Sequence, residues 1–286
     1  MPKHISQDRP PIRLVVSDLD GTLLDGQADL TEDARAAVAA LRDAGIMFTF
    51  ATGRMDPMTW AFASELDLDL PIISTNGALI RAQGEGKIYH QETMRDEDID
   101  KLFSYGLERE MDVLIYTSGE AYHFPWSTRI AFFRNYNQKA EAKNEPLVPL
   151  IETTERPAAG EGWRGRVLKV FINYAEEEKD ELFRFLEGFE HIEMQQSAAG
   201  TIDLNAVGCS KGRAVNWLSE HYQIPLEQIC TIGDQENDLA MLELSGLSLA
   251  MGNAIPRVQA AADHVLPTHY EEGFAVGIRR HVLKQA

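Results

Sequence analysis

The sequence predicts an α/β protein, a doubly wound parallel sheet whose chain is interrupted by a second, α+β domain. Short apolar runs alternate with amphipathic helical segments near both ends of the 286-residue chain. Polar, glycine-containing turns follow several of these runs, and the middle of the chain shows hairpin patterns instead. Alternating strands and helices are typical of open parallel sheets, in which ligands bind beyond the carboxyl ends of the strands.

The N-terminal part predicts the order strand, helix, strand, helix, strand. Between the first two strands, Thr31 is a suitable helix N-cap, acidic residues follow it in the first turn, and Gly45 suits the end of that helix. A second helix is expected over residues 57–66. Three apolar runs are expected as buried parallel strands, residues 13–17, 46–51 and 72–74.

The middle of the chain mixes hairpins with helices. Helices are expected at residues 96–110, 128–139 and 176–188, and residues 146–165 are rich in loop-forming residues. Strand-like runs occur at residues 78–81, 87–90, 112–116, 121–124, 167–173 and 192–196.

From Thr201 the alternating pattern returns. Helices are expected from Ser210, as N-cap, to residue 221, and at residues 238–244 and 255–262. The two ends of the chain therefore predict one discontinuous core domain, residues 1–83 and 199–286, with residues 84–198 inserted in it. Strands are expected at residues 201–205, 228–232 and 247–251.

Charge and composition narrow the classes of function. The chain has 27 basic and 45 acidic residues, a net charge of −18, which argues against nucleic acid or an anionic membrane as a partner. Its two cysteines do not make a disulfide framework. The N-terminus has no apolar stretch typical of a secretory signal, so we expect a cytoplasmic protein, monomeric or weakly homo-oligomeric.

The first chemical signal is an acidic pair directly after the first predicted strand. Asp18 and Asp20, two residues apart in one loop, can converge on one point. One carboxylate can attack phosphorus and hold a metal, while the other can protonate a leaving group and later activate water. The alternative is an ordinary surface turn, because Asp and Gly are common turn residues.

Two further signals follow apolar elements elsewhere in the chain. Thr52 and Gly53 offer a hydroxyl and loop amides to a phosphoryl group, and Arg54 either adds charge there or forms a surface salt bridge. Lys211 begins a predicted helix, where a cation is unfavourable for the helix dipole, which points to an anionic partner or ligand. The alternative for Lys211 is a solvated surface residue.

The last signal is the sequence GDQENDLA over residues 233–240, which follows another apolar strand. Its three acids, Asp234, Glu236 and Asp238, repel one another, and Mg²⁺, which prefers oxygen ligands, would relieve that repulsion. An acidic helix N-terminus is the alternative. Taken together, the four loops supply what phosphoryl transfer needs: positioning, charge neutralisation and an attacking group.

With these four motifs in order, the chain resembles the haloacid dehalogenase superfamily of aspartate-nucleophile phosphatases. Within it, the sequence is similar to the Cof-like group, which carries a large type IIB cap after the second motif. The resemblance covers nearly the whole chain and implies a Rossmann-like core with an inserted α+β cap that selects the substrate. Residues 73–78 and 251–254 are similar to further signatures of this group.

The resemblance implies a role for each motif residue. Asp18 would be the nucleophile and a metal ligand, and Asp20 the general acid/base, with its main-chain carbonyl on the metal. Lys211 would bind phosphate and steady Asp18, so the implied catalytic set is Asp18, Asp20 and Lys211. Phosphate would be bound by Thr52, Gly53, Lys211 and Asn237, Mg²⁺ by Asp18, Asp20, Asp234 and Asp238, and the remaining substrate by Arg54, Asn76 and Gly77.

The expected function is hydrolysis of phosphomonoesters of small metabolites, with Mg²⁺ as cofactor. Sugar phosphates are the leading substrate class and phosphorylated cofactors the next. The alternatives are a phosphotransferase or phosphomutase acting on sugar phosphates, and a non-catalytic binding or regulatory protein that kept the fold. Candidate cap contacts, for which core packing or solvation is the alternative, are His123, Trp126, Arg129, Arg134 and Lys169.

Overall fold

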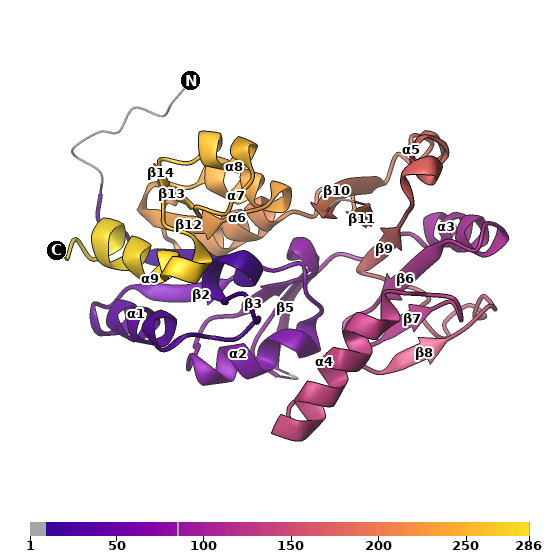
Figure 1. The fold of residues 1–286 in the computed structure, drawn as a ribbon, viewed down its shortest axis with the longest axis horizontal. Helices are drawn as coiled ribbons and strands as arrows, with labels where there is room; N and C mark the ends of the chain where they lie inside the picture. Colours follow the sequence, from indigo (N-terminus) through magenta and orange to yellow (C-terminus); the bar gives the residue numbers. More distant parts are fainter. Residues whose placement is uncertain (1–9, 85, 199, 286) are drawn as a thin grey trace.

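The computed structural model describes residues 10–84, 86–198 and 200–285 of the chain. The N-terminal stretch from which no secretory signal was expected lies mostly outside these residues. The two ends of the described chain lie together on one side of the molecule, and the middle of the chain forms the other side (Figure 1). None of the described helices has both the length and the apolar character needed to cross a bilayer.

A five-stranded, fully parallel sheet lies at the centre of the side of the molecule that contains both ends of the chain. The order of its strands is β14-β13-β12-β1-β2. Its strands are β1 (Leu14–Ser17), β2 (Met47–Phe50), β12 (Ile229–Gly233), β13 (Leu247–Ala250) and β14 (His264–Val265). Its helices are α1 (Glu32–Asp43), α2 (Trp60–Glu65), α6 (Lys211–Tyr222), α7 (Leu239–Leu244), α8 (Pro256–Ala261) and α9 (Gly273–Gly277).

Both faces of this sheet are buried, as its uninterrupted apolar strands predict. Along β1, Val15 packs in the cluster that contains α1 and α9 residues, whereas Leu14 and Val16 pack with residues of α6 and with Met241 of α7. Thr31 caps α1 as predicted, because its side chain accepts a hydrogen bond from the Ala34 amide. The predicted doubly wound core is confirmed.

A three-stranded antiparallel sheet, in the order β3-β4-β5, extends this core. Its strands are β3 (Ile72–Ser74), β4 (Leu79–Arg81) and β5 (Ile88–Gln91). A parallel bridge between Ala51 and Ile73 joins it to the end of β2. The predicted domain boundary at residues 83/84 falls inside the β4–β5 hairpin, so hydrogen bonding keeps β5 with the core.

The other side of the molecule, which we call the cap, is a six-stranded sheet in the order β10-β11-β9-β6-β7-β8, with three helices. Its pairings are antiparallel except for β7 with β8. The strands are β6 (Asp112–Tyr116), β7 (Ala121–His123), β8 (Leu150–Glu152), β9 (Lys169–Asn173), β10 (Ile192–Ala198) and β11 (Thr201–Ala206). The helices are α3 (Asp96–Glu108), α4 (Ile130–Lys143) and α5 (Lys179–Leu186).

Strand β11 corrects the second predicted boundary. The sequence assigned residues 201–205 to the core, but β11 pairs with β9 and β10 in the cap sheet. The segment was assigned to the core because the alternation of strands and helices resumes there, but its buried residues Ile202 and Leu204 pack in the cap cluster. Strands β8 and β14 and helix α9 were not predicted, since each is short and lacks a clear hydrophobic period.

Candidate active site

The first acidic motif begins where β1 ends. The amide of Asp18 donates a 2.8 Å hydrogen bond to the carbonyl of Ile232 in β12, which fixes the backbone at the carboxyl edge of the sheet. The chain then turns through Leu19–Leu23, where Gly21 has a φ of +76°. A Cβ at position 21 would lie 2.6 Å from Oδ2 of Asp234, so the close approach of these two loops requires glycine.

Lys211, the first residue of α6, joins two of the predicted acidic residues. Its Nζ donates to Oδ1 of Asp18 and to Oδ1 of Asp238, each at 2.6 Å, and all three side chains are buried. Burial opposes the positive charge, but the two carboxylates outweigh burial and raise the pKa of Lys211. The amine therefore stays cationic, and the surface alternative for Lys211 is wrong.

Asp238 is held through both of its oxygens. While Oδ1 accepts from Lys211, Oδ2 accepts from the amides of Asp234 and Gln235 at 2.8 and 2.9 Å. A Cβ at Gly233 would lie 2.5 Å from the Cβ of Asp238, so the end of β12 packs directly on this side chain. This geometry favours a role for Asp238 in orienting Lys211.

The carboxylates of Asp18, Asp234 and Asp238 form a buried cluster whose ligand atoms lie within 4.8 Å of one another. Burial raises the pKa of Asp18 well above its usual range, against the effect of Lys211. Burial and the neighbouring Asp238 raise the pKa of Asp234 to about 7. An all-oxygen set of mutually repelling carboxylates fits a hard divalent cation such as Mg²⁺.

Three side chains orient Asp234 within this cluster. Thr22 Oγ1 donates to Oδ1 at 3.3 Å, and the amide groups of Gln235 and Asn253 each donate to Oδ2 at 3.2 Å. Asn253 also donates to the Gly21 carbonyl at 2.9 Å and so connects the first and last loops. The sequence singled out residues 251–254 without a role, and the structure gives Asn253 one.

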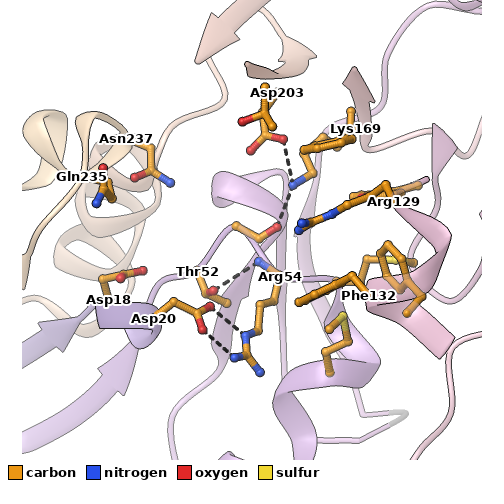
Figure 2. A pocket seen from close by; sticks show the side chains of 17 residues that line it. Asp18, Asp20, Thr52, Arg54, Arg129, Phe132, Lys169, Asp203, Gln235 and Asn237 are labelled. Carbon is orange, nitrogen blue, oxygen red and sulfur yellow. Dashed lines mark hydrogen bonds and ion pairs between the residues drawn. The ribbon is translucent and has the colours of Figure 1, made fainter. Parts of the chain in front are cut away.

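Asp20 and Arg54 pair beside the buried cluster, as Figure 2 shows. Arg54 Nε donates to Asp20 Oδ2 at 2.7 Å and Nη2 donates to Oδ1 at 2.5 Å, a two-pronged contact that uses both carboxylate oxygens. The Asp20 side chain is 53% exposed and lies outside the buried acidic cluster. Its predicted metal contact through the main-chain carbonyl stays a prediction.

A cavity of about 270 Å³ lies between these core loops and the cap. The buried Thr52 side chain lines it, and its Oγ1 accepts from the Arg54 amide at 3.1 Å. The other core residues that line it are Asp18, Asp20, Gly53, Arg54, Met55, Met58, Gln235 and Asn237. The cap residues are Tyr116, Arg129, Phe132, Phe133, Lys169, Phe171, Thr201 and Asp203.

Asn76, predicted as a substrate contact, is fully buried and uses its polar groups on protein partners. Its amide donates to the Thr52 carbonyl at 2.9 Å, its Nδ2 donates to Asp203 at 3.1 Å, and its Oδ1 accepts from Asn237 at 3.1 Å. Gly77 packs against the start of α6, since an added Cβ would lie 2.4 Å from the carbonyl of Ser210, the N-cap of that helix. Neither Asn76 nor Gly77 lines the cavity, so both correct the prediction: they position the loops.

The cap contacts the loop that contains Thr52 and Gly53 through a buried lysine. Lys169 Nζ donates to the Gly53 carbonyl at 2.8 Å and forms an ion pair with Asp203 Oδ1 at 3.2 Å (Figure 2). Burial lowers the pKa of Lys169, and Asp203 only partly compensates. This contact fixes the position of the Gly53 backbone relative to the cap.

Of the five candidate cap contacts, Arg129 and Lys169 line the cavity, and the other three do not. His123 is buried with Nδ1 2.8 Å from the Phe124 carbonyl, and Trp126 donates to the Met111 carbonyl. Arg134 is exposed on α4. These three follow the structural alternatives given for them.

A family model of haloacid dehalogenase-like hydrolases matches residues 15–278. The chain belongs to this family. Its match begins inside β1 and ends at the residue that directly follows α9, so it includes all four loops of the site. The resemblance inferred from the motifs is thereby confirmed.

Curated relatives of this haloacid dehalogenase-like hydrolase include phosphatases. Phosphatase YwpJ of Bacillus subtilis (strain 168) is 31% identical over 299 residues, which cover 95% of this chain and 100% of that protein. The 5-amino-6-(5-phospho-D-ribitylamino)uracil phosphatase YcsE of the same strain is 27% identical, covering 98% of this chain and 99% of that protein. A solved haloacid dehalogenase-like hydrolase from B. subtilis has a TM-score of 0.81 and 25% identity, covering 94% of this chain and 100% of that one. The predicted class, a hydrolase of the phosphatase type, is confirmed.

Sequence reasoning missed several residues of this haloacid dehalogenase-like site. Asp203 and Asn205 of β11 contact the core: Asp203 accepts from Asn76 at 3.1 Å, and Asn205 donates to the Thr75 carbonyl at 3.1 Å. Asn205 also donates to the carbonyl of Leu168 in the cap at 2.9 Å. The signal was present as three polar residues, Thr201, Asp203 and Asn205, at alternate positions of one strand. Nothing in the sequence identified Phe132 and Phe171 as residues of the site, because aromatic residues usually pack in a core.

Proposed function

We propose that this protein is a Mg²⁺-dependent phosphatase that hydrolyses phosphomonoesters of small metabolites through a phospho-aspartate on Asp18. The observation that carries the proposal is the buried contact of Lys211 with Asp18 and Asp238 beside Asp234. A carboxylate, a fixed cation and a metal-binding acid at one sheet edge match the needs of phosphoryl transfer.

Asp18 would attack with the oxygen that Lys211 does not hold. Its Oδ1 accepts from Lys211, and its backbone is fixed on β12, so the carboxylate has one defined orientation. Attack on phosphorus forms the Asp18–phosphorus bond while the ester bond to the leaving oxygen breaks. Lys211 offsets the negative charge of the transferring group.

Asp20 would supply the proton for the leaving oxygen and then remove one from the water that hydrolyses the acyl phosphate. Arg54 holds both oxygens of Asp20, so one of these two hydrogen bonds opens before Asp20 takes part in proton transfer. Arg54 thus positions the acid/base.

The phosphoryl group would lie against Thr52, the Gly53 amide, Lys211 and the Asn237 side chain. Thr52 and Asn237 line the cavity, and Lys211 lies behind Asp18. Asp18, Asp234 and the main-chain carbonyl of Asp20 would hold Mg²⁺, with Asp238 acting through Lys211 or the metal's water shell. When bound, Mg²⁺ neutralises charge on the phosphoryl oxygens.

The leaving group would be a sugar or a polyhydroxylated chain. The cavity offers charged groups from Arg54, Arg129, Lys169 and Asp203 next to aromatic surfaces, which suits hydroxyl-rich compounds. YcsE, by its name, removes phosphate from a ribityl chain, which is a polyhydroxylated chain. We include the cytoplasmic location and the monomeric or weakly associated state in this proposal.

Phosphate release from p-nitrophenyl phosphate and from a panel of sugar and cofactor phosphates tests the proposal. We expect release that requires Mg²⁺, stops with EDTA and falls at least about 10³-fold in D18N, while the exposed matched variant D69N retains it. Turnover that persists in D18N contradicts the nucleophile. Transfer of phosphate to an added sugar rather than to water would establish a phosphotransferase, and binding without turnover a regulatory protein.

A further inference from the structure

The cap wall of the cavity contains a cation without a carboxylate partner. In the described residues, Arg129 forms no ion pair, whereas Arg54 pairs with Asp20 and Lys169 with Asp203. The Nε atom of Arg129 is buried and has no hydrogen-bond partner. Among the described residues, Arg129 is therefore the one charged side chain of the cap wall that has no ion-pair partner.

Arg129 is held in a fixed orientation. Its guanidinium carbon lies 4.1 Å from the centre of the Phe132 ring and 4.9 Å from that of Phe171. With aromatic rings against it, the guanidinium offers the polar edge of its plane to a ligand. Figure 2 shows the side chain pointing into the cavity beside Lys169, towards the loop that contains Thr52.

The backbone that carries Arg129 is also fixed. Oδ2 of the buried Asp112 accepts hydrogen bonds from the amides of Thr128 and Arg129, each at 3.0 Å, at the start of α4. Its Oδ1 accepts from the Ser127 hydroxyl. Asp112 therefore acts on the backbone and leaves the guanidinium uncompensated.

We propose that Arg129 binds a carboxylate of the substrate at the end remote from the phosphate, so that the preferred substrates are phosphorylated sugar acids or hydroxy acids. A planar guanidinium edge with one unpaired charge matches a planar carboxylate with one charge, in two parallel hydrogen bonds. The other polar side chains of the cap wall are Tyr116, Lys169, Thr201 and Asp203, and Lys169 and Asp203 pair with each other. This inference rests on the proposed phosphatase function and specifies its substrate class.

Matched pairs of substrates test it. In each pair a terminal carboxylate replaces a terminal hydroxymethyl group: 3-phosphoglycerate with glycerol 3-phosphate, 4-phosphoerythronate with erythritol 4-phosphate, and 6-phosphogluconate with sorbitol 6-phosphate. The three chain lengths sample different separations between phosphate and carboxylate. The ratio of kcat/KM within a pair cancels any general loss of activity.

We expect the wild-type protein to prefer the carboxylate of at least one pair by about tenfold or more. R129Q should reduce that ratio to about twofold or less, mainly through KM, and R129K should restore it in part, because lysine keeps the charge but not the fork. The matched cap variant R184Q, in which an exposed arginine of α5 is replaced, should keep the wild-type ratio.

A wild-type ratio near one in all three pairs, or a preference that survives in R129Q, overturns the proposal. Calorimetric binding of the same compounds to D18N and to D18N/R129Q measures the carboxylate preference without turnover. If no compound is hydrolysed, the phosphatase function fails. A binding preference that R129Q removes would still support the subsite, and equal binding would reject it.

Discussion

Two buried lysines, Lys211 in the core and Lys169 in the cap, have different surroundings. Lys211 in the core contacts two carboxylates, Asp18 and Asp238, and its pKa is raised although burial opposes its charge. Lys169 in the cap contacts one carboxylate, Asp203, and burial lowers its pKa. The pKa values of two similarly buried lysines are thus shifted in opposite directions, because the two have different numbers of acidic partners.

The difference between the two lysines indicates that the core wall and the cap wall of the cavity have different roles. The core wall is a compact cluster of acids around one cation, held by backbone amides and by Asn253, and suits a reaction with a phosphoryl group. In the cap wall, Lys169 pairs with one carboxylate, that of Asp203, and Arg129 has no acidic partner among the residues described. We expect the core wall to set the rate and the cap wall to set the choice of substrate.

Replacement of Lys211 gives the largest expected effect in this comparison. K211M leaves Asp18 and Asp238 without their shared cation, so kcat should fall about 10²–10³-fold. The free energy of unfolding should fall by about 3 kcal/mol or more, because two buried acids lose their partner. Steady-state kinetics and denaturant unfolding measure the two effects.

K169M is the matched control for K211M, since it also removes a buried lysine. It breaks the contact with the Gly53 carbonyl and the ion pair with Asp203, but it does not touch Asp18. We expect a KM increase of about tenfold or less and a smaller change in kcat. A fall in kcat as large as that of K211M would remove the distinction between the two walls.

Titration of Asp234 is expected to have a smaller effect, which appears as a change in the stability of the protein with pH. Burial, with Asp238, raises its pKa from 3.8 to about 7. Its stabilising contribution is complete below pH 3.8, where the group is protonated in both states, and is lost as the pH rises through about 7. The metal-free protein should therefore lose thermal stability between these pH values, by at least about 2 °C in Tm.

D234N removes this titration, so its Tm should vary less over the same pH range than that of the wild type. Mg²⁺ should raise the Tm of the wild type most at neutral pH, where the carboxylates are ionised, and should raise that of D234N little. The exposed variant D69N should follow the wild type. An equal response of D234N to Mg²⁺ would contradict the assignment of Asp234 as a ligand.

Much of the core was predictable from the sequence because its signals are local. Each strand of the parallel sheet that was predicted is an apolar run, and each of the four motifs directly follows the strand or begins the helix that positions it. Residues 18, 52, 211 and 234 therefore meet at one edge, as the topology of parallel sheets requires. The contact of Lys211 with Asp18 is the direct result.

The cap was less predictable because its signals depend on distant partners. Strand β11 directly precedes helix α6, as a core strand would, and only its pairing with β9 and β10 assigns it to the cap. Asn76 has a polar side chain in a motif loop, and only the structure shows that Asp203 and Asn237 occupy it. Arg129 and Arg134 are five residues apart, about 1.4 turns of a helix. Only the structure shows that Arg129 packs against Phe171 while Arg134 is exposed.

The central claim is that Asp18 carries the phosphoryl group during turnover. The most direct measurement is acid quenching of the D20N protein during turnover of p-nitrophenyl phosphate with Mg²⁺, followed by mass spectrometry of its peptides. D20N should slow the hydrolysis step, because Asp20 no longer activates water, and so should allow the intermediate to accumulate. We expect one phosphoryl group on the peptide that contains Asp18, and none in D18N/D20N. Phosphate release without any phosphorylated peptide, or phosphorylation of another residue, would contradict the proposed mechanism.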